Sequence, residues 1–190
     1  MNFKYIDYNK SNYKKEIKKL YINSFAREER YPFWLVKSCA KGENVEFNVI
    51  IDKNKLIGME YLLKYNNTVY LFYLAIGLNQ RGNGYGSKVL ADLLERYKDK
   101  SIILCIERPD ENNETDIRIR RKKFYLKNGF YSTNKYTEDN GVEYEVLCTN
   151  KELNVTKEVL EDLYKQMSKT FISGYIISKL YNVEYVHFIK

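Results

Sequence analysis

The chain has 190 residues, 44% of them hydrophobic, and carries a formal net charge of +7. Its length and apolar content fit a single domain with a sizeable core and exclude an intrinsically disordered chain. A basic excess can indicate nucleic-acid binding, but here the lysines are spread along the whole chain. Because there is no RGG segment, zinc-finger pattern or basic-aromatic RNA-binding segment, we predict no nucleic-acid partner.

The reactive side chains exclude several other kinds of site. Cys39, Cys105 and Cys148 are widely separated and form no CxxC pair, which predicts free thiols in a reducing compartment. His187 is the only histidine, so a histidine-based triad or metal cluster is excluded, and we predict no metal. The N-terminal residues lack an apolar signal core, and no uncharged apolar run is long enough to span a bilayer. We therefore predict a cytoplasmic protein with no membrane partner.

The first part of the chain is predicted to form one helix followed by an aromatic loop. Ser11 is in position to cap this helix. Its apolar side is formed by Ile17, Leu20, Tyr21 and Phe25. In the segment FAREERYPFW, residues 25–34, Pro32 prevents the helix from continuing. The same segment places Glu28 and Glu29 beside aromatic residues.

Three antiparallel strands are predicted next. Residues 45–52 and 56–65 are rich in strand-forming residues, and the four residues 52–55 read as a hairpin turn that connects them. Asn66 and Asn67 then turn the chain into a strand that starts near Val69 and ends at Ile76. This third strand leads directly into a glycine-rich segment.

The glycine-rich segment, residues 81–87, is predicted to be a loop that connects the preceding strand to a following helix. Gly82, Gly84 and Gly86 lie in the turn, and apolar residues at helical spacing follow to Tyr97. Such a loop exposes several backbone N–H groups at the positive end of a helix dipole, where an anion can bind. The missing side chains let a diphosphate approach the backbone.

Three phosphate-binding patterns compete for this loop. A Walker loop fails because Asn83 stands where the lysine is required. The dinucleotide pattern GxGxxG is weak because Ser87 takes the place of its third glycine. The pattern [Q/R]xxGxG is met by Arg81, Gly84 and Gly86.

The second half of the chain is predicted to form a parallel strand, a helix and a hairpin. The apolar run Ser101–Glu107 is typical of a strand buried on both faces and parallel to the central strand. An acidic loop, residues 107–116, precedes a basic helix at 118–127 that Asn128 and Gly129 can terminate. A hairpin of residues 130–136 and 142–148, turning at 138–141, follows.

The last segment is predicted to pack on the same domain. Thr156 is in position to cap a helix with one apolar side, formed by Val159, Leu160, Leu163, Tyr164 and Met167. The tail, residues 173–190, fits a strand or a helix, and we consider it as a surface for a homodimer. We therefore predict a single core at 1–150 and a C-terminal helix and tail at 151–190 packed on it.

Two motifs together resemble the GNAT superfamily of acyl-CoA-dependent N-acyltransferases. The first is the loop pattern of Arg81, Gly84 and Gly86, and the second is the segment FYLKNGF at 124–130, which resembles the family's FYxxxGF. The resemblance implies a mixed α/β fold, a central mostly antiparallel sheet with one parallel, splayed strand pair and flanking helices. It also implies acetyl transfer from acetyl-CoA to a primary amine by direct attack in a ternary complex. The alternative is a non-catalytic module of this fold that binds acyl-CoA or another protein.

The resemblance also implies which residues bind the two substrates. The pyrophosphate of coenzyme A would lie on Arg81, Gly82, Asn83, Gly84, Tyr85, Gly86 and Ser87. Its pantetheine arm would bind the backbone at Leu74 and Ile76, like an added strand. The amine acceptor, a small molecule or a protein, would be cationic and would enter past Glu28, Glu29 and the acidic loop.

For the chemical step, Tyr125 stands where family members often use a phenol to protonate the leaving thiolate. Glu107, at the end of the parallel strand, is the preferred base, and Glu60, Glu28, Glu29 and water are alternatives. Arg118 takes the place of an asparagine that contacts the cofactor in many members. We do not carry that contact over, although an arginine can reach a phosphate.

Overall fold

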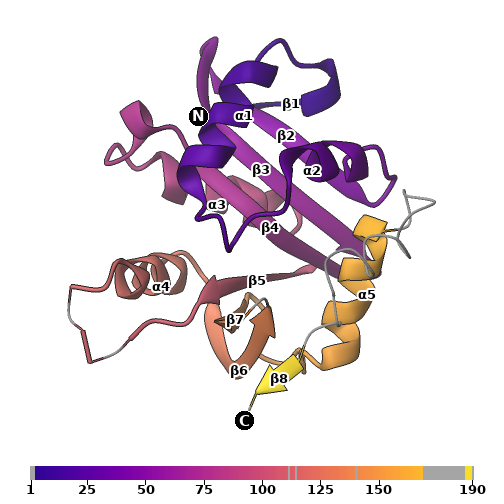
Figure 1. Ribbon diagram of the computed structural model, residues 1–190, viewed down its shortest axis with the longest axis vertical. Helices are drawn as coiled ribbons and strands as arrows, with labels where there is room; N and C mark the ends of the chain where they lie inside the picture. The colour runs from indigo at the N-terminus through magenta and orange to yellow at the C-terminus, as the bar shows by residue number, and fades with distance from the viewer. Residues whose placement is uncertain (1–2, 111, 114, 140, 169–186, 190) are drawn as a thin grey trace.

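The computed structural model describes residues 3–110, 112–113, 115–139, 141–168 and 187–189 (Figure 1). Within these residues the strands form one eight-stranded sheet in the order β1-β2-β3-β4-β5-β7-β6-β8. The strands are β1 Lys4–Asp7, β2 Val45–Asp52, β3 Lys55–Tyr65, β4 Thr68–Ile76, β5 Ser101–Glu107, β6 Tyr131–Asp139, β7 Val142–Cys148 and β8 His187–Ile189. Neighbouring strands are antiparallel except for β4 and β5. This confirms the predicted sheet with one parallel pair.

Helices cover both faces of the sheet (Figure 1). They are α1 Lys14–Ser24, α2 Phe33–Cys39, α3 Tyr85–Arg96, α4 Ile117–Lys127 and α5 Lys157–Ser168. On one face, α1, α2 and α5 share a buried core with β2, β3 and β4. On the other face, α3 packs over β4 and β5 together with aromatic residues from α4 and the following turn. The sheet is therefore buried on both faces, as its continuous apolar strands predict.

The turns of the first half follow from their residue types. A hairpin was predicted at 52–55, and Lys53 and Asn54, which both have positive φ, 46° and 64°, form its two-residue turn between β2 and β3. Asn66, with φ 50°, turns β3 into β4. Asparagine tolerates this left-handed conformation because its short side chain can bond locally.

Three local predictions were wrong or incomplete. Ser11 is not the N-cap residue of α1: the helix begins at Lys14, its N-cap residue is Tyr13, and the Ser11 Oγ accepts the Tyr13 N–H just before the helix. The loop at 25–34 leads into the short helix α2, which begins directly after Pro32 and whose residues were not assigned to a helix from the sequence. Strand β1 was not predicted at all. Its four residues show no clear alternation, and pairing with β2 stabilises it.

The C-terminal part departs from the sequence prediction in one place that concerns the site. Glu138 and Asp139 were predicted in a turn, but β6 continues through both, and Asp139 pairs with Val142. Helix α5 forms as predicted and buries Leu160 and Leu163 in the core with α1 and α2. Apart from β8, the segment considered as a homodimer surface lies outside the described residues.

Candidate active site

The parallel strands β4 and β5 separate after three residues. Their pairing runs from Thr68 opposite Ser101 to Tyr70 opposite Ile103, and no later residues of these strands pair with each other. On the other side of β4, Tyr61 pairs with Tyr73 and Leu62 with Leu71, so Phe72 is an extra residue. A bulge of this kind bends a strand and increases its twist, which moves β4 away from β5. Beyond Tyr70 and Ile103 the facing edges of both strands are therefore not paired with any other described strand.

A cavity of about 660 Å³ occupies this gap, and we call it the central cleft. It is lined by both free strand edges, the glycine loop, the start of α3 and the inner side of α4. The predicted site residues that line it are Glu29, Leu74, Ile76, Arg81, Gly82, Gly84, Tyr85, Gly86, Ser87, Glu107 and Tyr125. Asn83 and Glu28 do not line it: both are exposed, and Glu28 lines a separate groove beside α1 and α2.

The glycine loop presents free amides to the cleft. The Lys88 N–H donates to the Gly84 carbonyl at 3.1 Å, which starts the helical hydrogen bonding of α3. The N–H groups of residues 85–87 precede this bond and have no acceptor within the helix. Gly84 has φ 73°, and a Cβ built there would meet nothing closer than 3.9 Å. A glycine is therefore required for the backbone angle, and the space beside it is open.

Gly86 is needed for a different reason. A Cβ at this position would lie 3.0 Å from Cζ of Phe124, so the glycine allows α3 to pack closely against α4. The Arg81 guanidinium is turned back, donating from Nε to the Ile76 carbonyl at 3.0 Å and from Nη2 to Ser24 Oγ at 3.3 Å. The two predicted motifs thus touch through Gly86 and Phe124.

Tyr125 lies on α4 with its ring packed edge-on against Phe124 and Phe130, at centroid distances of 5.3 and 5.6 Å. Among the described residues, no hydrogen bond to its hydroxyl is present. Burial raises the pKa of Tyr125 to about 12, although the charge of Arg121 acts in the opposite direction. The phenol therefore stays protonated at neutral pH and is free to donate a hydrogen bond into the central cleft.

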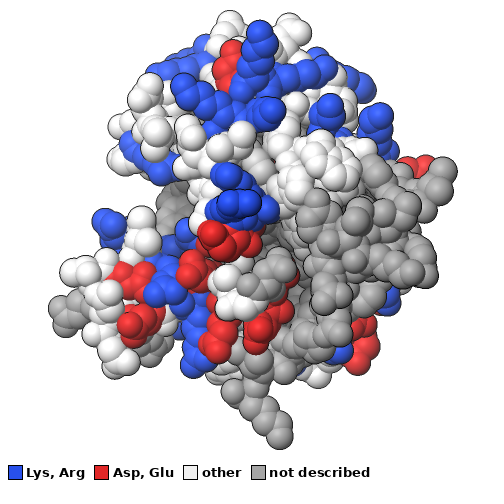
Figure 2. All heavy atoms as spheres, in the orientation of Figure 1, with Lys and Arg blue, Asp and Glu red and all other residues white. Residues whose placement is uncertain are grey.

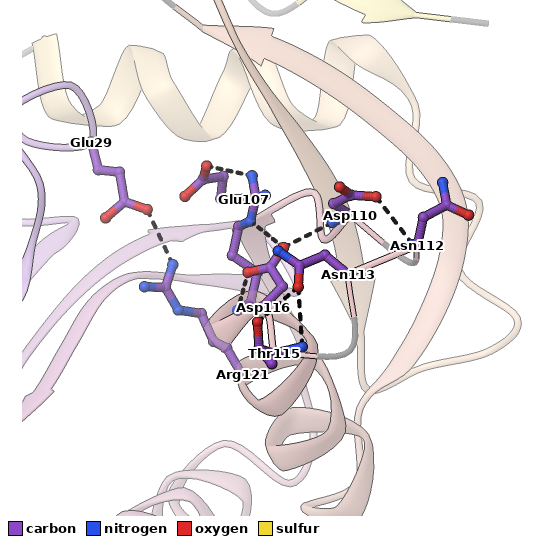
Figure 3. Close-up of polar contacts among 9 residues, drawn as sticks. Glu29, Glu107, Asp110, Asn112, Asn113, Thr115, Asp116 and Arg121 are labelled. Atoms are coloured by element: carbon purple, nitrogen blue, oxygen red, sulfur yellow. Dashed lines mark hydrogen bonds and ion pairs between the residues drawn. The ribbon is translucent and has the colours of Figure 1, made fainter.

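Glu107 belongs to a charged network at the start of α4 (Figure 3). Arg118 donates from Nη1 to Glu107 Oε1 at 2.8 Å and from Nε to Asp116 Oδ2 at 2.7 Å. Asp116 also caps α4 by accepting the Arg118 N–H at 2.8 Å. The suggestion that Arg118 reaches a phosphate is not supported, because two carboxylates hold its guanidinium. Glu111 and Glu114, also part of the predicted acidic loop, lie outside the described residues.

Glu29 crosses the central cleft from the loop between α1 and α2. Figure 3 shows its side chain pointing toward Arg121 on α4, and its Oε1 lies 3.1 Å from Arg121 Nη1. The Tyr73 hydroxyl holds this loop against β4, donating to the Glu29 carbonyl at 3.4 Å and accepting the Tyr31 N–H at 3.2 Å. The backbone of the loop, and with it the Glu29 side chain, is therefore fixed by a strand residue.

Glu60 is removed from the candidate bases. Its side chain is fully buried on the α3 face of the sheet, and it does not line the central cleft. Arg96 Nη2 donates to both of its carboxylate oxygens, at 2.9 and 2.8 Å, and Asn48 donates to Oε1 at 3.1 Å. Glu60 thus supports packing between β3 and α3.

Several residues of the cleft were missed from the sequence. Tyr31, Thr137, Asp139, Tyr144 and Tyr164 all line it. Asp139 was assigned to a turn because Asp-Asn-Gly is a strong turn signal. Its spacing of two from Thr137, which puts both on one face of a strand, is the signal that points to the cleft.

Other kinds of site are not found in the described part of the chain. Cys39, Cys105 and Cys148 form no disulfide within the described residues. The described residues contain no group of three His, Cys, Asp or Glu side chains that can hold a metal ion. In the described ranges no helix is long and apolar enough to cross a membrane.

Comparison with known proteins identifies the family. The sequence profile of the Acetyltransferase (GNAT) family matches residues 14–130. The chain belongs to this family. It is therefore an acetyl-CoA-dependent N-acetyltransferase, which confirms the predicted fold, enzyme class and acyl donor and favours the enzyme over a non-catalytic module. No curated protein sequence matches the chain significantly.

Solved structures of other GNAT proteins share the fold at low sequence identity. A putative GNAT acetyltransferase from Bacteroides thetaiotaomicron is 22% identical, with TM-score 0.69, covering 97% of this chain and 100% of its own. An aminoglycoside 6'-N-acetyltransferase in complex with coenzyme A is 15% identical, with TM-score 0.62 and coverage of 82% and 100%. A spermidine N-acetyltransferase from Vibrio cholerae is 15% identical, with TM-score 0.59 and coverage of 80% and 96%.

Proposed function

We propose that acetyl-CoA lies along the central cleft and that the acceptor amine attacks its thioester directly in a ternary complex. The observation that carries this proposal is the separation of β4 and β5 beyond Tyr70. It opens one cavity that contains the glycine loop, both free strand edges and Tyr125. A donor bound on the loop can therefore reach the acceptor without a covalent enzyme intermediate.

The donor is held mainly by backbone groups. The free amides of residues 85–87 and the helix dipole of α3 bind the pyrophosphate. The pantetheine arm pairs with the free edge of β4 at Leu74 and Ile76, in the place where β5 has moved away. An N–H on the same edge stabilises the oxyanion of the tetrahedral intermediate.

Two side chains serve the proton transfers. Tyr125 donates its proton to the leaving thiolate of coenzyme A. Its hydroxyl lines the cleft without a hydrogen-bond partner among the described residues, and its raised pKa means that the phenol still carries the proton at neutral pH. Glu107 accepts a proton from the ammonium group of the acceptor, directly or through water, and the neutral amine that results attacks the thioester. Its Oε1 is held by Arg118 at 2.8 Å, and this ion pair orients the carboxylate toward the cleft.

The acceptor is cationic and enters past Glu29. Figure 2 shows Lys and Arg side chains over most of the upper part of this face, while most Asp and Glu side chains lie in the lower half. The lower half holds β5, β6 and β7, and the cleft receives Glu107 and Asp139 from these strands. The aminoglycoside and spermidine enzymes of similar fold also act on amines. Both a small molecule and a protein amino group fit this chemistry.

The cellular location, the domain organisation and the oligomeric state are further proposals. The lack of a disulfide among the three cysteines of the described residues supports a location in the reducing cytoplasm. The packing of α5 in one core with α1 and α2 supports a single domain that includes residues 151–168. A homodimer formed through residues 173–190 stays a prediction.

Acetyl-CoA titration followed by an amine screen tests the proposed function. Calorimetry should show binding of acetyl-CoA at a single site, and amines should then release free coenzyme A thiol in a concentration-dependent way. Thiol release without formation of an acetylated amine, or kinetics of the ping-pong type, would contradict direct transfer.

A further inference from the structure

Three carboxylates surround Tyr144 at one end of the central cleft. Burial raises the pKa of Tyr144, and the negative charges of Glu29, Asp139 and Glu107 raise it further. The strand register explains their grouping: Glu107 and Thr137 both pair with Tyr144, and Asp139 lies two residues beyond Thr137 on β6. All of these side chains consequently point to the same face of the sheet.

The three carboxylates differ in their partners. Glu29 forms an ion pair with Arg121 at 3.1 Å, and Glu107 forms one with Arg118 at 2.8 Å. Asp139 forms no ion pair or hydrogen bond through its carboxylate within the described residues. Burial raises its pKa, because the charged form has lost water without gaining a positive partner. A cation brought into the cleft supplies that partner.

The surroundings of Asp139 suit an organic cation. Its charge acts on the phenols of Tyr31, Tyr144 and Tyr164, and all four residues line the cleft. Tyr31 stacks on Phe72 at 5.9 Å, and Tyr164 meets the same ring edge-on at 5.8 Å. Aromatic ring faces attract ammonium groups, and desolvation strengthens that attraction.

Asp139 is too far from the point of reaction to hold the attacking amine. The thioester belongs between β4 and β5, whereas β6 is two strands beyond β5. With strands about 4.8 Å apart and a two-residue offset of about 3.4 Å per residue, the Cα atoms of Glu107 and Asp139 are about 12 Å apart. One ammonium beside Glu107 therefore leaves Asp139 without a partner.

We propose that the acceptor carries a second cationic group, distant from the reacting amine, and that Asp139 with Tyr31, Tyr144 and Tyr164 binds this group. The inference rests on the proposed function, because it takes the thioester position from it. It defines the acceptor class as a flexible diamine or polyamine. Asp139 determines acceptor specificity and takes no part in the proton transfers.

Two acceptors with the same carbon chain test the inference. Hexamethylenediamine and hexylamine differ only in the second ammonium, and kcat and KM for each are measured at saturating acetyl-CoA. Asp139→Asn should raise KM for the diamine about 10- to 100-fold, the loss expected for one hydrogen-bonded charge pair. It should leave kcat, KM for hexylamine and acetyl-CoA affinity unchanged. Glu152→Gln, which removes an exposed charge outside the cleft, is the matched control.

Calorimetry with the coenzyme A-saturated protein provides a second measurement that does not require turnover. The wild type should bind the diamine more tightly than the monoamine, and Asp139→Asn should abolish that difference. Equal losses for both amines, or an unchanged preference for the diamine, would overturn the inference. Diamine binding that depends on Asp139 but gives no thiol release would support the inference and contradict the proposed function instead.

Discussion

Replacing Tyr125 with phenylalanine tests the proposed acid directly. The substitution keeps the ring that packs against Phe124 and Phe130 and removes only the hydroxyl. Because no described residue bonds that hydroxyl, its loss should change the free energy of unfolding by less than about 1 kcal/mol. A change in turnover can therefore be assigned to the missing donor.

The size of the effect follows from one charge-assisted hydrogen bond. Such a bond to a developing thiolate contributes about 1.5 to 3 kcal/mol, so kcat should fall about 10- to 150-fold. Affinity for acetyl-CoA should stay within about twofold, because the ground-state thioester needs no proton. Single-turnover thiol release is the appropriate assay, since it measures chemistry even where product release limits steady-state turnover.

The pH dependence gives the same experiment a second readout. Burial raises the pKa of Tyr125 from 10 to about 12, so the phenol keeps its proton throughout the neutral and mildly alkaline range. The wild-type rate should therefore show no loss attributable to Tyr125 below about pH 10. Tyr131→Phe, at an exposed tyrosine outside the central cleft, should behave like the wild type. A Tyr125→Phe variant with wild-type single-turnover rate would refute the catalytic role.

Two further predictions concern substrate binding. Gly84→Val and Gly86→Val should each weaken acetyl-CoA binding, measured by calorimetry, at least about 10-fold. Valine at position 84 cannot adopt the positive φ without strain, and valine at position 86 displaces Phe124. Unchanged affinity in both folded variants would contradict the loop assignment. Glu29→Gln should raise KM for a cationic amine about 10-fold, because Arg121 is left uncompensated in the cleft, while Glu28→Gln changes it little. Equal changes in the two glutamate variants would contradict this assignment.

The family and the glycine loop were predictable because their signals are local. A glycine at a positive φ, a run of free amides at a helix start and a strand buried on both faces are all properties of consecutive residues. The predicted turn at Gly84 and the predicted buried strand Ser101–Glu107 are therefore both found in the structure. The FYxxxGF segment belongs to this group too, since its ring packing takes place within one helix and turn.

The acceptor end of the site was decided by tertiary structure, because strand register and loop anchoring determine which carboxylates meet. Glu28 and Glu29 are neighbours in sequence, yet only Glu29 lines the cleft, in a loop that the Tyr73 hydroxyl holds from β4. Glu60 is buried against Arg96 on the opposite face of the sheet. Asp139 lines the cleft because β6 pairs with β7 as far as this residue. The sequence Asp-Asn-Gly instead predicted a turn at Asp139. The sequence by itself determined the family and the glycine loop with its free amides, and the fold alone decided which carboxylates line the central cleft.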